Sequence, residues 1–507
     1  MVIKAELLGK IRRFWMVLLA GIAALLMTAG CTVGPNYKRP AASVPATYRG
    51  ETDLSSPANQ AGASASNAPE SPSPQPATPA ANTSGSNIPT GTPLGEEKWW
   101  EVFQDKQLQA LIRTALQNNY DVRIAATRVL QAQAQLGITR ANQYPTLTGG
   151  GNVTSVRDPT IGPIPAYEIT LGQVTASASW NIDFWGQYRR ATEAARATLL
   201  ANQWAQKAVI SSLVADVASS YFQLRQLDLE LEISKNTLAS RQDSLDLTKT
   251  LEQHGINSLL DVRQSEQLVY TAAAEIPDLE RQIAQQENAI NILLGNNPGG
   301  IARGLKLTEQ PHAPEVPVGL PSALLERRPD IREAEEDLVA ANAQIGVARA
   351  AYFPQIALTG TAGYESPKLT DLFQGPAGVW TLAGGLVQPI FEGGRLKSGV
   401  QLAEAQRDQL VLNYQQTIQG AFRDVSNALI GYRKYREFRI QQEHLVESAQ
   451  DAAHLSEIRF KAGTTDYLEV LTNETNSFSA ELTLAQAQGN ELIALVQLYQ
   501  ALGGGWK

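Results

Sequence analysis

Cysteine is almost absent from this chain of 507 residues. Cys31 is its only cysteine, which excludes intramolecular disulfides and thiolate metal clusters. Histidine is also scarce, and His254, His312, His444 and His454 have no metal-ligand partners at a useful spacing. No glycine-rich phosphate loop follows a strand pattern, and no Gly-x-Ser-x-Gly elbow occurs. We therefore expect no enzyme activity, no cofactor and no metal site.

An excess of positive charge is missing as well, since the net charge is −8. A surface this acidic argues against nucleic acid as a partner. Long apolar runs are also lacking apart from residues 14–29, which follow a basic start containing Arg12 and Arg13. Small residues then lead from Thr28 to Cys31, which is the layout of a secretory signal.

A cysteine at the end of such a segment resembles a bacterial lipoprotein signal. That resemblance implies cleavage after residue 30, lipidation of Cys31 with palmitate among the acyl groups, and sorting to the outer membrane. Thr28 stands where the motif usually has leucine. The alternative is an uncleaved anchor, but the run is at the short limit of the roughly 17–25 residues that cross a bilayer.

The segment after the signal, residues 31–96, is mostly alanine, serine, proline, threonine, asparagine and glycine. Such a composition cannot bury enough apolar surface to offset the entropy of ordering. We interpret it as a lipid-anchored segment followed by a flexible tether.

An internal repeat organises the rest of the chain. Residues 121–145 and 330–354 share identical residues at a spacing of 209, and Gly255 and Gly463 are 208 apart. Two copies of about 208 residues are expected, at 97–310 and 311–507. In both, a helical pattern stops at a proline, because proline cannot continue a helix. The helix-to-strand joints are marked by Arg140 and Pro145 in the first copy and by Arg349 and Pro354 in the second.

After each joint the apolar period changes from 3.6 to 2. Residues 174–184 alternate apolar and polar side chains, which suits a transmembrane strand of about 9–11 residues. We expect β-hairpins at about 146–184 and 355–390. A soluble hairpin with one dry face is the alternative. Four strands cannot close a barrel, so strands in a membrane would need several chains.

Long helices follow each hairpin. Residues 187–254 contain no proline, and the return segment carries Val262, Val269 and Ile276 at seven-residue spacing, as in a coiled coil. The second copy repeats this pattern, with turns expected at Gly255 and Gly463. The predicted fold class is mainly α, with a small transmembrane β part and two tandem repeats.

With these features the sequence resembles the TolC-like outer membrane factors, in particular the lipoprotein branch that serves multidrug efflux. The resemblance rests on residues 31–40 and 99–111, the two joints, residues 391–395 and the ending at 502–506. It implies a homotrimer with a β-barrel and an α-helical barrel, located in the outer membrane with a periplasmic extension. It also implies passive export with an inner-membrane pump and a periplasmic adaptor as partners. The alternative is a surface-anchored coiled-coil lipoprotein with a structural or adhesive role.

The family narrows its channel at the periplasmic tip with acidic residues after the second turn. The resemblance places Asp466, Glu469 and Thr472 there, with Thr472 in place of an acid. Glu469 is the hypothesised constriction ring, or else an ordinary acid in the first turn of a helix. Gly255 and Gly463 are expected to form the tip turns that meet the adaptor, or to be plain helix C-caps.

Three further residues are candidates for the mouth of the barrel. Asp183 and Arg189 follow the second predicted strand, and Arg395 is the counterpart of this region in the second copy. Interfacial or structural roles are the more common reading of such residues.

Overall fold

The order of short helices, hairpin, long helix, turn and return helix occurs twice in the structure. The computed structural model describes residues 32–41, 44–49, 93–160, 162–163, 166–311 and 319–506. Its elements, in chain order, are η1 (Leu94–Glu96), α2 (Trp99–Val102), α3 (Lys106–Asn118), α4 (Tyr120–Ala141), β1 (Thr146–Asp158), β2 (Tyr167–Ile182), α5 (Gln187–Gln253), α6 (Leu259–Leu293), η2 (Leu307–Glu309), α7 (Pro321–Arg327), α8 (Pro329–Ala350), β3 (Gln355–Ser366), η3 (Leu369–Asp371), η4 (Gly375–Ala377), β4 (Gly378–Val387), α9 (Arg395–Lys461) and α10 (Tyr467–Ala501). Cys31 and most of the predicted tether lie outside the described residues.

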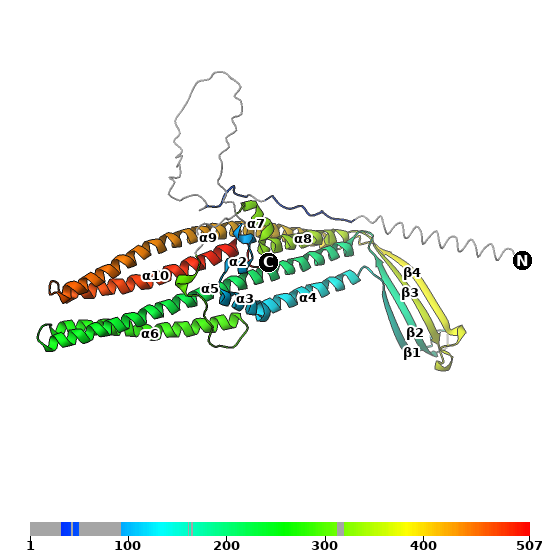
Figure 1. The fold of residues 1–507 in the computed structure, drawn as a ribbon. Coiled ribbons are helices and arrows are strands. Elements are labelled where there is room, and N and C mark those ends of the chain that lie inside the picture. The colour runs from blue at the N-terminus through cyan, green and yellow to red at the C-terminus, as the bar shows by residue number, and fades with distance from the viewer. Residues whose placement is uncertain are drawn as a thin grey trace, which may run out of the picture. The chain divides into compact units, whose positions relative to one another are not determined.

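The chain divides into two compact units. Among the described residues, the sheet unit comprises those within 32–41, 125–205 and 332–417, and the hairpin unit comprises those within 44–124, 206–331 and 418–506. In the sheet unit the strands lie side by side in the antiparallel order β1-β2-β3-β4 (Figure 1). The hairpins of the two repeats therefore join through β2 and β3. Within the described part of the chain, β1 and β4 are the outer strands and pair on one side only.

Proline marks the change from helix to strand in both repeats. Pro145 lies between α4 and β1, and Pro354 lies between α8 and β3. Each proline follows a short turn closed by backbone hydrogen bonds: Tyr144 donates to Ala141, and Phe353 donates to Ala350. Because the residue before a proline favours extended backbone, the chain passes from this turn into a strand.

Residues 32–39, which we call the strap, lie across the first turn of α5 and the middle of α8. Arg190 is 4% exposed and donates to Asn36 Oδ1 at 2.9 Å. Glu335 is 7% exposed and accepts two hydrogen bonds from the Arg39 guanidinium, at 2.6 and 2.5 Å. Gly34, at φ +109°, crosses Gly346 so closely that a Cβ on it would lie 2.5 Å from the Gly346 Cα. The strap is thus an integral part of the sheet unit.

In the hairpin unit α6 runs beside α5 and α10 beside α9 (Figure 1). α5 and α9 are continuous helices of 67 residues, each about 100 Å long at 1.5 Å per residue. The seven-residue apolar pattern of α6 forms a buried seam, which includes Val262, Val269, Leu279, Ile283 and Ile290. α10 buries Leu471, Phe478, Leu492 and Tyr499. The coiled-coil prediction is confirmed in both repeats.

Candidate channel wall and aperture

The register of the sheet gives it one apolar and one polar face, because residues paired directly across antiparallel strands share a face. The apolar face carries Leu147, Val153, Val174, Ala176, Ala178, Trp180, Ile182, Ile356, Leu358, Ala362, Tyr364, Trp380, Leu382 and Leu386. The polar face carries Thr146, Thr148, Asn152, Thr154, Gln173, Thr175, Ser177, Ser179, Asn181, Thr359, Thr361, Glu365 and Thr381. The period of 2 read from the sequence therefore holds for residues 174–182 and for most of the residues paired with them. Toward the loop between β1 and β2 it breaks down, because Val156 and Ile169 lie on the polar face and Arg157 and Glu168 on the apolar face.

Both faces of this sheet are largely open in the protomer. On the apolar face, Trp380 is 79% exposed and Leu382 is 77% exposed. On the polar face, hydroxyl pairs connect neighbouring strands: Thr146 with Ser179 at 2.7 Å, and Ser177 with Thr361 at 3.3 Å. A sheet with one apolar face and one polar face is suited to a boundary between lipid and water.

The two tip turns have the same backbone geometry. Gly255 and Gly463 adopt φ +72° and +70°, in the left-handed region that favours glycine. At the first turn, Ile256 N donates to the Leu251 carbonyl, and at the second, Thr464 N donates to the Arg459 carbonyl. Apart from the adjacent residues of the chain, no described atom lies within 4 Å of a Cβ built on either glycine. Conformation, rather than space, therefore requires glycine at both turns.

The candidate aperture residues lie at the start of α10. Asp466 is the N-cap residue, and Thr472 donates its hydroxyl to the Leu468 carbonyl at 2.8 Å. Glu469 accepts from Arg459 at 2.8 Å and from the Thr465 hydroxyl. Sequence reasoning missed Arg459, which lies on α9 across the turn. The charge of Glu469 is therefore compensated within its own protomer.

The residues at the helix-to-strand joints have structural contacts. Arg349 forms an ion pair with Glu404 at 2.7 Å, and the Pro354 carbonyl accepts from Trp185 Nε1 at 2.9 Å. Arg140 and Pro145 stand at the matching positions of the first repeat, at the end of α4 and directly before β1.

The residues considered for the barrel mouth are also paired. The Asp183 carboxylate accepts from the Arg189 backbone at 2.8 Å, and Arg395 pairs with Glu392 at 2.6 Å. These contacts order the first turns of α5 and α9.

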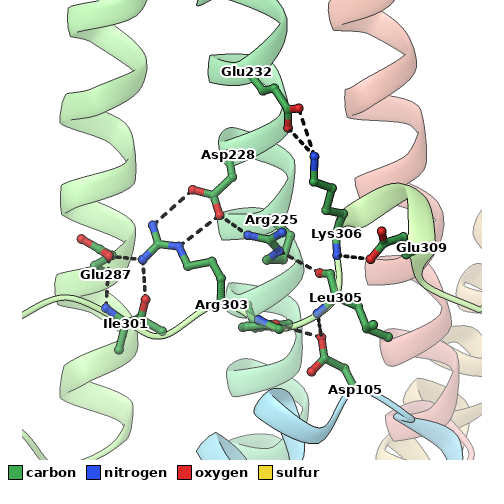
Figure 2. A network of polar contacts seen from close by, with 12 residues as sticks. Asp105, Arg225, Asp228, Glu232, Glu287, Ile301, Arg303, Leu305, Lys306 and Glu309 are labelled. Atoms are coloured by element: carbon green, nitrogen blue, oxygen red, sulfur yellow. Dashed lines mark hydrogen bonds and ion pairs between the residues drawn. The ribbon is translucent and has the colours of Figure 1, made fainter.

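A buried polar hub in the hairpin unit carries no signal in the sequence. Asp105, 2% exposed, caps α3 and accepts from Tyr221, from the Leu305 N–H and from Gln310 at 2.9–3.0 Å. Burial alone would raise the pKa of Asp105, but the hydrogen bonds from Gln310, Tyr221 and the backbone outweigh it and lower the pKa. The loop between α6 and η2, which contains Leu305, also places Arg303 between Asp228 and Glu287 (Figure 2).

Near the tips, hydroxyl groups tie the hairpins of the two repeats together. Ser265 on α6 lies 2.5 Å from the Tyr467 hydroxyl on α10 and 3.5 Å from Thr248 on α5. Arg241 on α5, which is 3% exposed, donates to the Leu268 carbonyl and lies over the Phe478 ring of α10. The hairpins are therefore joined by buried polar contacts as well as by apolar packing.

The described residues contain no helix long and apolar enough to cross a membrane. The same residues contain no group of three or more histidine, cysteine or carboxylate side chains placed to hold a metal ion.

The two-faced sheet of one unit and the coiled-coil hairpins of the other are together the features of a membrane channel. The profile of the outer membrane efflux protein family matches residues 111–296 and 320–504, one stretch in each repeat. The chain therefore belongs to this family of non-enzymatic outer-membrane efflux channels. The predictions of family, TolC-like fold class and export function are confirmed.

Individual relatives extend over nearly the whole chain. The solvent efflux pump outer membrane protein SrpC of Pseudomonas putida is 36% identical over 95% of this chain and 97% of its own. The cation efflux system protein CusC of Escherichia coli is 32% identical over 97% of this chain and 99% of its own. The open-state structure of the MtrE outer membrane channel of Neisseria gonorrhoeae has a TM-score of 0.79 at 30% identity, covering 94% of this chain and 99% of that one.

Proposed function

We propose that this chain forms the outer-membrane exit duct of a tripartite efflux system, as a lipid-anchored homotrimer. The observation that carries the proposal is the two-faced sheet with unpaired outer strands. Open strand edges are not tolerated in lipid, because each unpaired backbone group costs several kcal/mol there. Pairing β4 of one copy with β1 of the next removes those edges and turns the polar faces toward a common lumen.

Exposed apolar side chains on the helices next to these strands support the same assembly. Leu130 and Ile138 on α4 are each 63% exposed, and Leu402 and Leu412 on α9 are exposed to a similar extent. α4 leads into β1, and α9 follows β4. Association of copies along both the strands and the helices would cover these side chains. Full burial of each would contribute roughly 1.5–3 kcal/mol to the free energy of association.

Electron microscopy of the detergent-extracted protein tests the assembly. Three-fold particles with a detergent belt at one end are expected. Monomers or dimers without a belt would refute the proposal and favour a surface-anchored coiled-coil lipoprotein.

Membrane insertion of the sheet is tested by neighbouring substitutions on opposite faces of β4. Leu382→Lys places a charge on the apolar face, at a cost of about 2–4 kcal/mol near the bilayer midplane. Thr381→Lys places the same charge on the polar face and is the matched control. We expect Leu382→Lys alone to reduce the yield of folded, membrane-extracted protein. Equal yields from both variants would exclude lipid contact by this face.

Passive conduction of small molecules is the proposed transport role. The relatives named above are described as serving solvent efflux in one case and cation efflux in another, although each aligns with nearly this whole chain. A fold shared by such different cargoes favours selection of the cargo by an inner-membrane pump. The energy for export would then come from the pump, with a periplasmic adaptor connecting the two.

The helix tips are the proposed adaptor contact. Next to the turn at Gly255, Leu259 and Leu260 are exposed, and next to the turn at Gly463, Leu468 is exposed. An adaptor that covers these side chains would bury apolar surface at the tips. Leu260→Glu is expected to abolish co-purification of the adaptor, whereas Gln267→Glu, further along α6, leaves it intact. Equal co-purification would rule out this contact.

Glu469 is proposed to line the aperture with its copies in the trimer, flanked by Asp466 and Thr472. Because Arg459 pairs with Glu469, the ring would carry little net charge. Arg459→Ala should therefore increase cation selectivity in planar bilayers, and Glu469→Ala should decrease it. Unchanged selectivity in both variants would remove Glu469 from the aperture.

Lipidation of Cys31 is the last part of the proposal. The strap brings Thr32 against Gly186, where β2 passes into α5, so an acyl group on the preceding residue would enter a bilayer beside the sheet. Palmitate labelling of the protein should be lost in Cys31→Ser. Persistent labelling would show that another residue carries the lipid.

A further inference from the structure

A carboxylate that occurs at the same position of both repeats has different partners in the two copies. Asp216 on α5 and Asp424 on α9 are 208 residues apart and therefore occupy equivalent positions. In the second repeat, Arg328 donates to Asp424 at 3.4 Å, to Asp330 at 2.6 Å and to the Ala501 carbonyl at 3.2 Å. Asp424 thus forms part of a guanidinium-binding site that the chain fills itself.

The first repeat has the same architecture without the cation. Asn119 stands at the position of Arg328 and donates to the Leu293 carbonyl at 3.0 Å, and Leu293 is the repeat partner of Ala501. In the second repeat the Arg328 guanidinium bonds both the Ala501 carbonyl and the Asp424 carboxylate. The Asn119 amide is too short to bond both the Leu293 carbonyl and the Asp216 carboxylate in the same way. The Asp216 carboxylate accepts no hydrogen bond from any described residue.

A pocket of about 400 Å³ lies at this position in the hairpin unit. Asp216, Ser219, Ser220 and Gln223 of α5 supply its polar side, and Leu293 of α6 and Ile493 of α10 supply apolar surface. This volume is within the range of pockets that hold small organic molecules. Although Asp216 is exposed at the pocket, partial burial raises the pKa of its carboxyl, and a cation would offset the cost of keeping it charged.

We infer that this pocket binds an amphiphilic organic cation, with its ammonium or guanidinium head on Asp216 and its apolar body against Leu293 and Ile493. The head replaces the guanidinium that Arg328 supplies in the second repeat. The hydroxyl groups of Ser219 and Ser220 accept from the same head group. This binding site does not depend on the proposed trimer or on the identity of the pump.

The probe is ethidium, a fluorescent organic cation with a planar apolar body, bound to the full-length protein in detergent and followed by fluorescence anisotropy. Asp216→Asn should weaken binding about tenfold, which is the effect of losing one charge-assisted contact. Asp243→Asn removes the same charge elsewhere on α5 and should leave the affinity unchanged. The anionic dye anilinonaphthalene sulfonate should not respond to Asp216→Asn.

A second pair of variants fills the pocket from within. Asn119→Arg supplies the guanidinium of the second repeat and should exclude ethidium, because the new side chain pairs with Asp216. Asn119→Ala removes the same α4 cap without adding a cation, and should bind ethidium like the wild type.

Three results would overturn the inference: no ethidium binding by the wild type, equal binding by Asp216→Asn and Asp243→Asn, or equal loss in both Asn119 variants. If Asp216→Asn changes only the stability of the oligomer and not ethidium affinity, an arginine of a second copy occupies the pocket, and the inference is also wrong. Thermal unfolding of each variant confirms that affinity is compared between folded proteins.

Discussion

Replacement of Asp105 by asparagine should release the loop that follows α6. The carboxylate accepts from the Tyr221 hydroxyl at 2.9 Å, from Leu305 N–H at 3.0 Å and from Gln310 at 3.0 Å, in addition to capping α3. A hydrogen bond to a charged group contributes about 1.5–3 kcal/mol, and bonds that share one acceptor are not additive. Asparagine keeps one acceptor oxygen but brings an N–H₂ group toward these donors. We expect a loss of about 3 kcal/mol, or roughly a hundredfold more frequent local opening.

Hydrogen exchange followed by mass spectrometry measures this opening directly. In Asp105→Asn, peptides covering residues 299–311 and 104–110 should exchange about a hundredfold faster, whereas peptides from the sheet should not change. Asp246→Asn is the control, because among the described residues only Gln242 donates to the Asp246 carboxylate, on the surface. Unchanged exchange at 299–311 would refute the proposed role of Asp105 in holding this loop. Uniformly faster exchange would show global destabilisation instead.

The effect should also depend on pH in a defined direction. The pKa of Asp105 is lower in the folded protein than in the unfolded chain. The stability that the Asp105 carboxylate contributes is therefore fully present above the pKa of about 3.9 in the unfolded chain. It is lost as the pH falls through the lower pKa of the folded protein. The difference in protection between wild type and Asp105→Asn should be constant above about pH 5. It should shrink only in more acidic solution, and a difference that already falls between pH 8 and 6 would point to another group.

Further predictions concern the strap, the tips and the link between the hairpins. Gly346→Val should displace the strap and make residues 32–41 accessible to protease, whereas Gly137→Val, its repeat partner with open space around it, should not. Gly463→Ala should destabilise its turn by about 1–2 kcal/mol, because alanine is strained at φ +70°, and exchange should rise at residues 459–466. Tyr467→Phe should remove the contact with Ser265, at a cost of about 1 kcal/mol seen as faster exchange at the start of α10; no change would mean that packing alone joins the hairpins.

Local sequence patterns predict the parts of this fold that depend on backbone geometry. Pro145 and Pro354 mark the change from helix to strand, and the seven-residue pattern from Val262 predicts the seam of α6. Such features follow from steric limits and periodicity within a short window. α6 nevertheless continues through Pro277, an interior helix position that normally costs about 3 kcal/mol. Leu279 and Ile283 of the same helix are buried, and burial of each such side chain contributes roughly 1.5–3 kcal/mol, which is of the same size as that cost.

Side-chain partners distant in sequence could not be predicted. Asp105 resembles any helix cap, since its partners Leu305 and Gln310 are about two hundred residues away. From the sequence, Glu469 is an acidic residue at a helix start. Arg459, which compensates its charge, lies on the other side of a turn. The strap sequence resembles a linker until Arg190 and Glu335 are seen to bind it. Each of these contacts depends on tertiary placement rather than on spacing.

The repeats are equivalent in backbone and unequal in side chains, and the differences lie where the two copies must act differently. At the strap, Gly346 is crossed by Gly34, and Glu335 binds Arg39, whereas the repeat partners of Gly346 and Glu335 are Gly137, with open space, and Ala126. The α8 side therefore binds the N-terminal segment of its own chain, while the α4 side keeps apolar side chains such as Leu130 and Ile138 exposed. The proposed trimer needs two different surfaces on each chain, because each copy would contact one neighbour on either side. The exposed α4 side would be one of them and the exposed α9 side, with Leu402 and Leu412, the other, whereas the strap already covers part of α8.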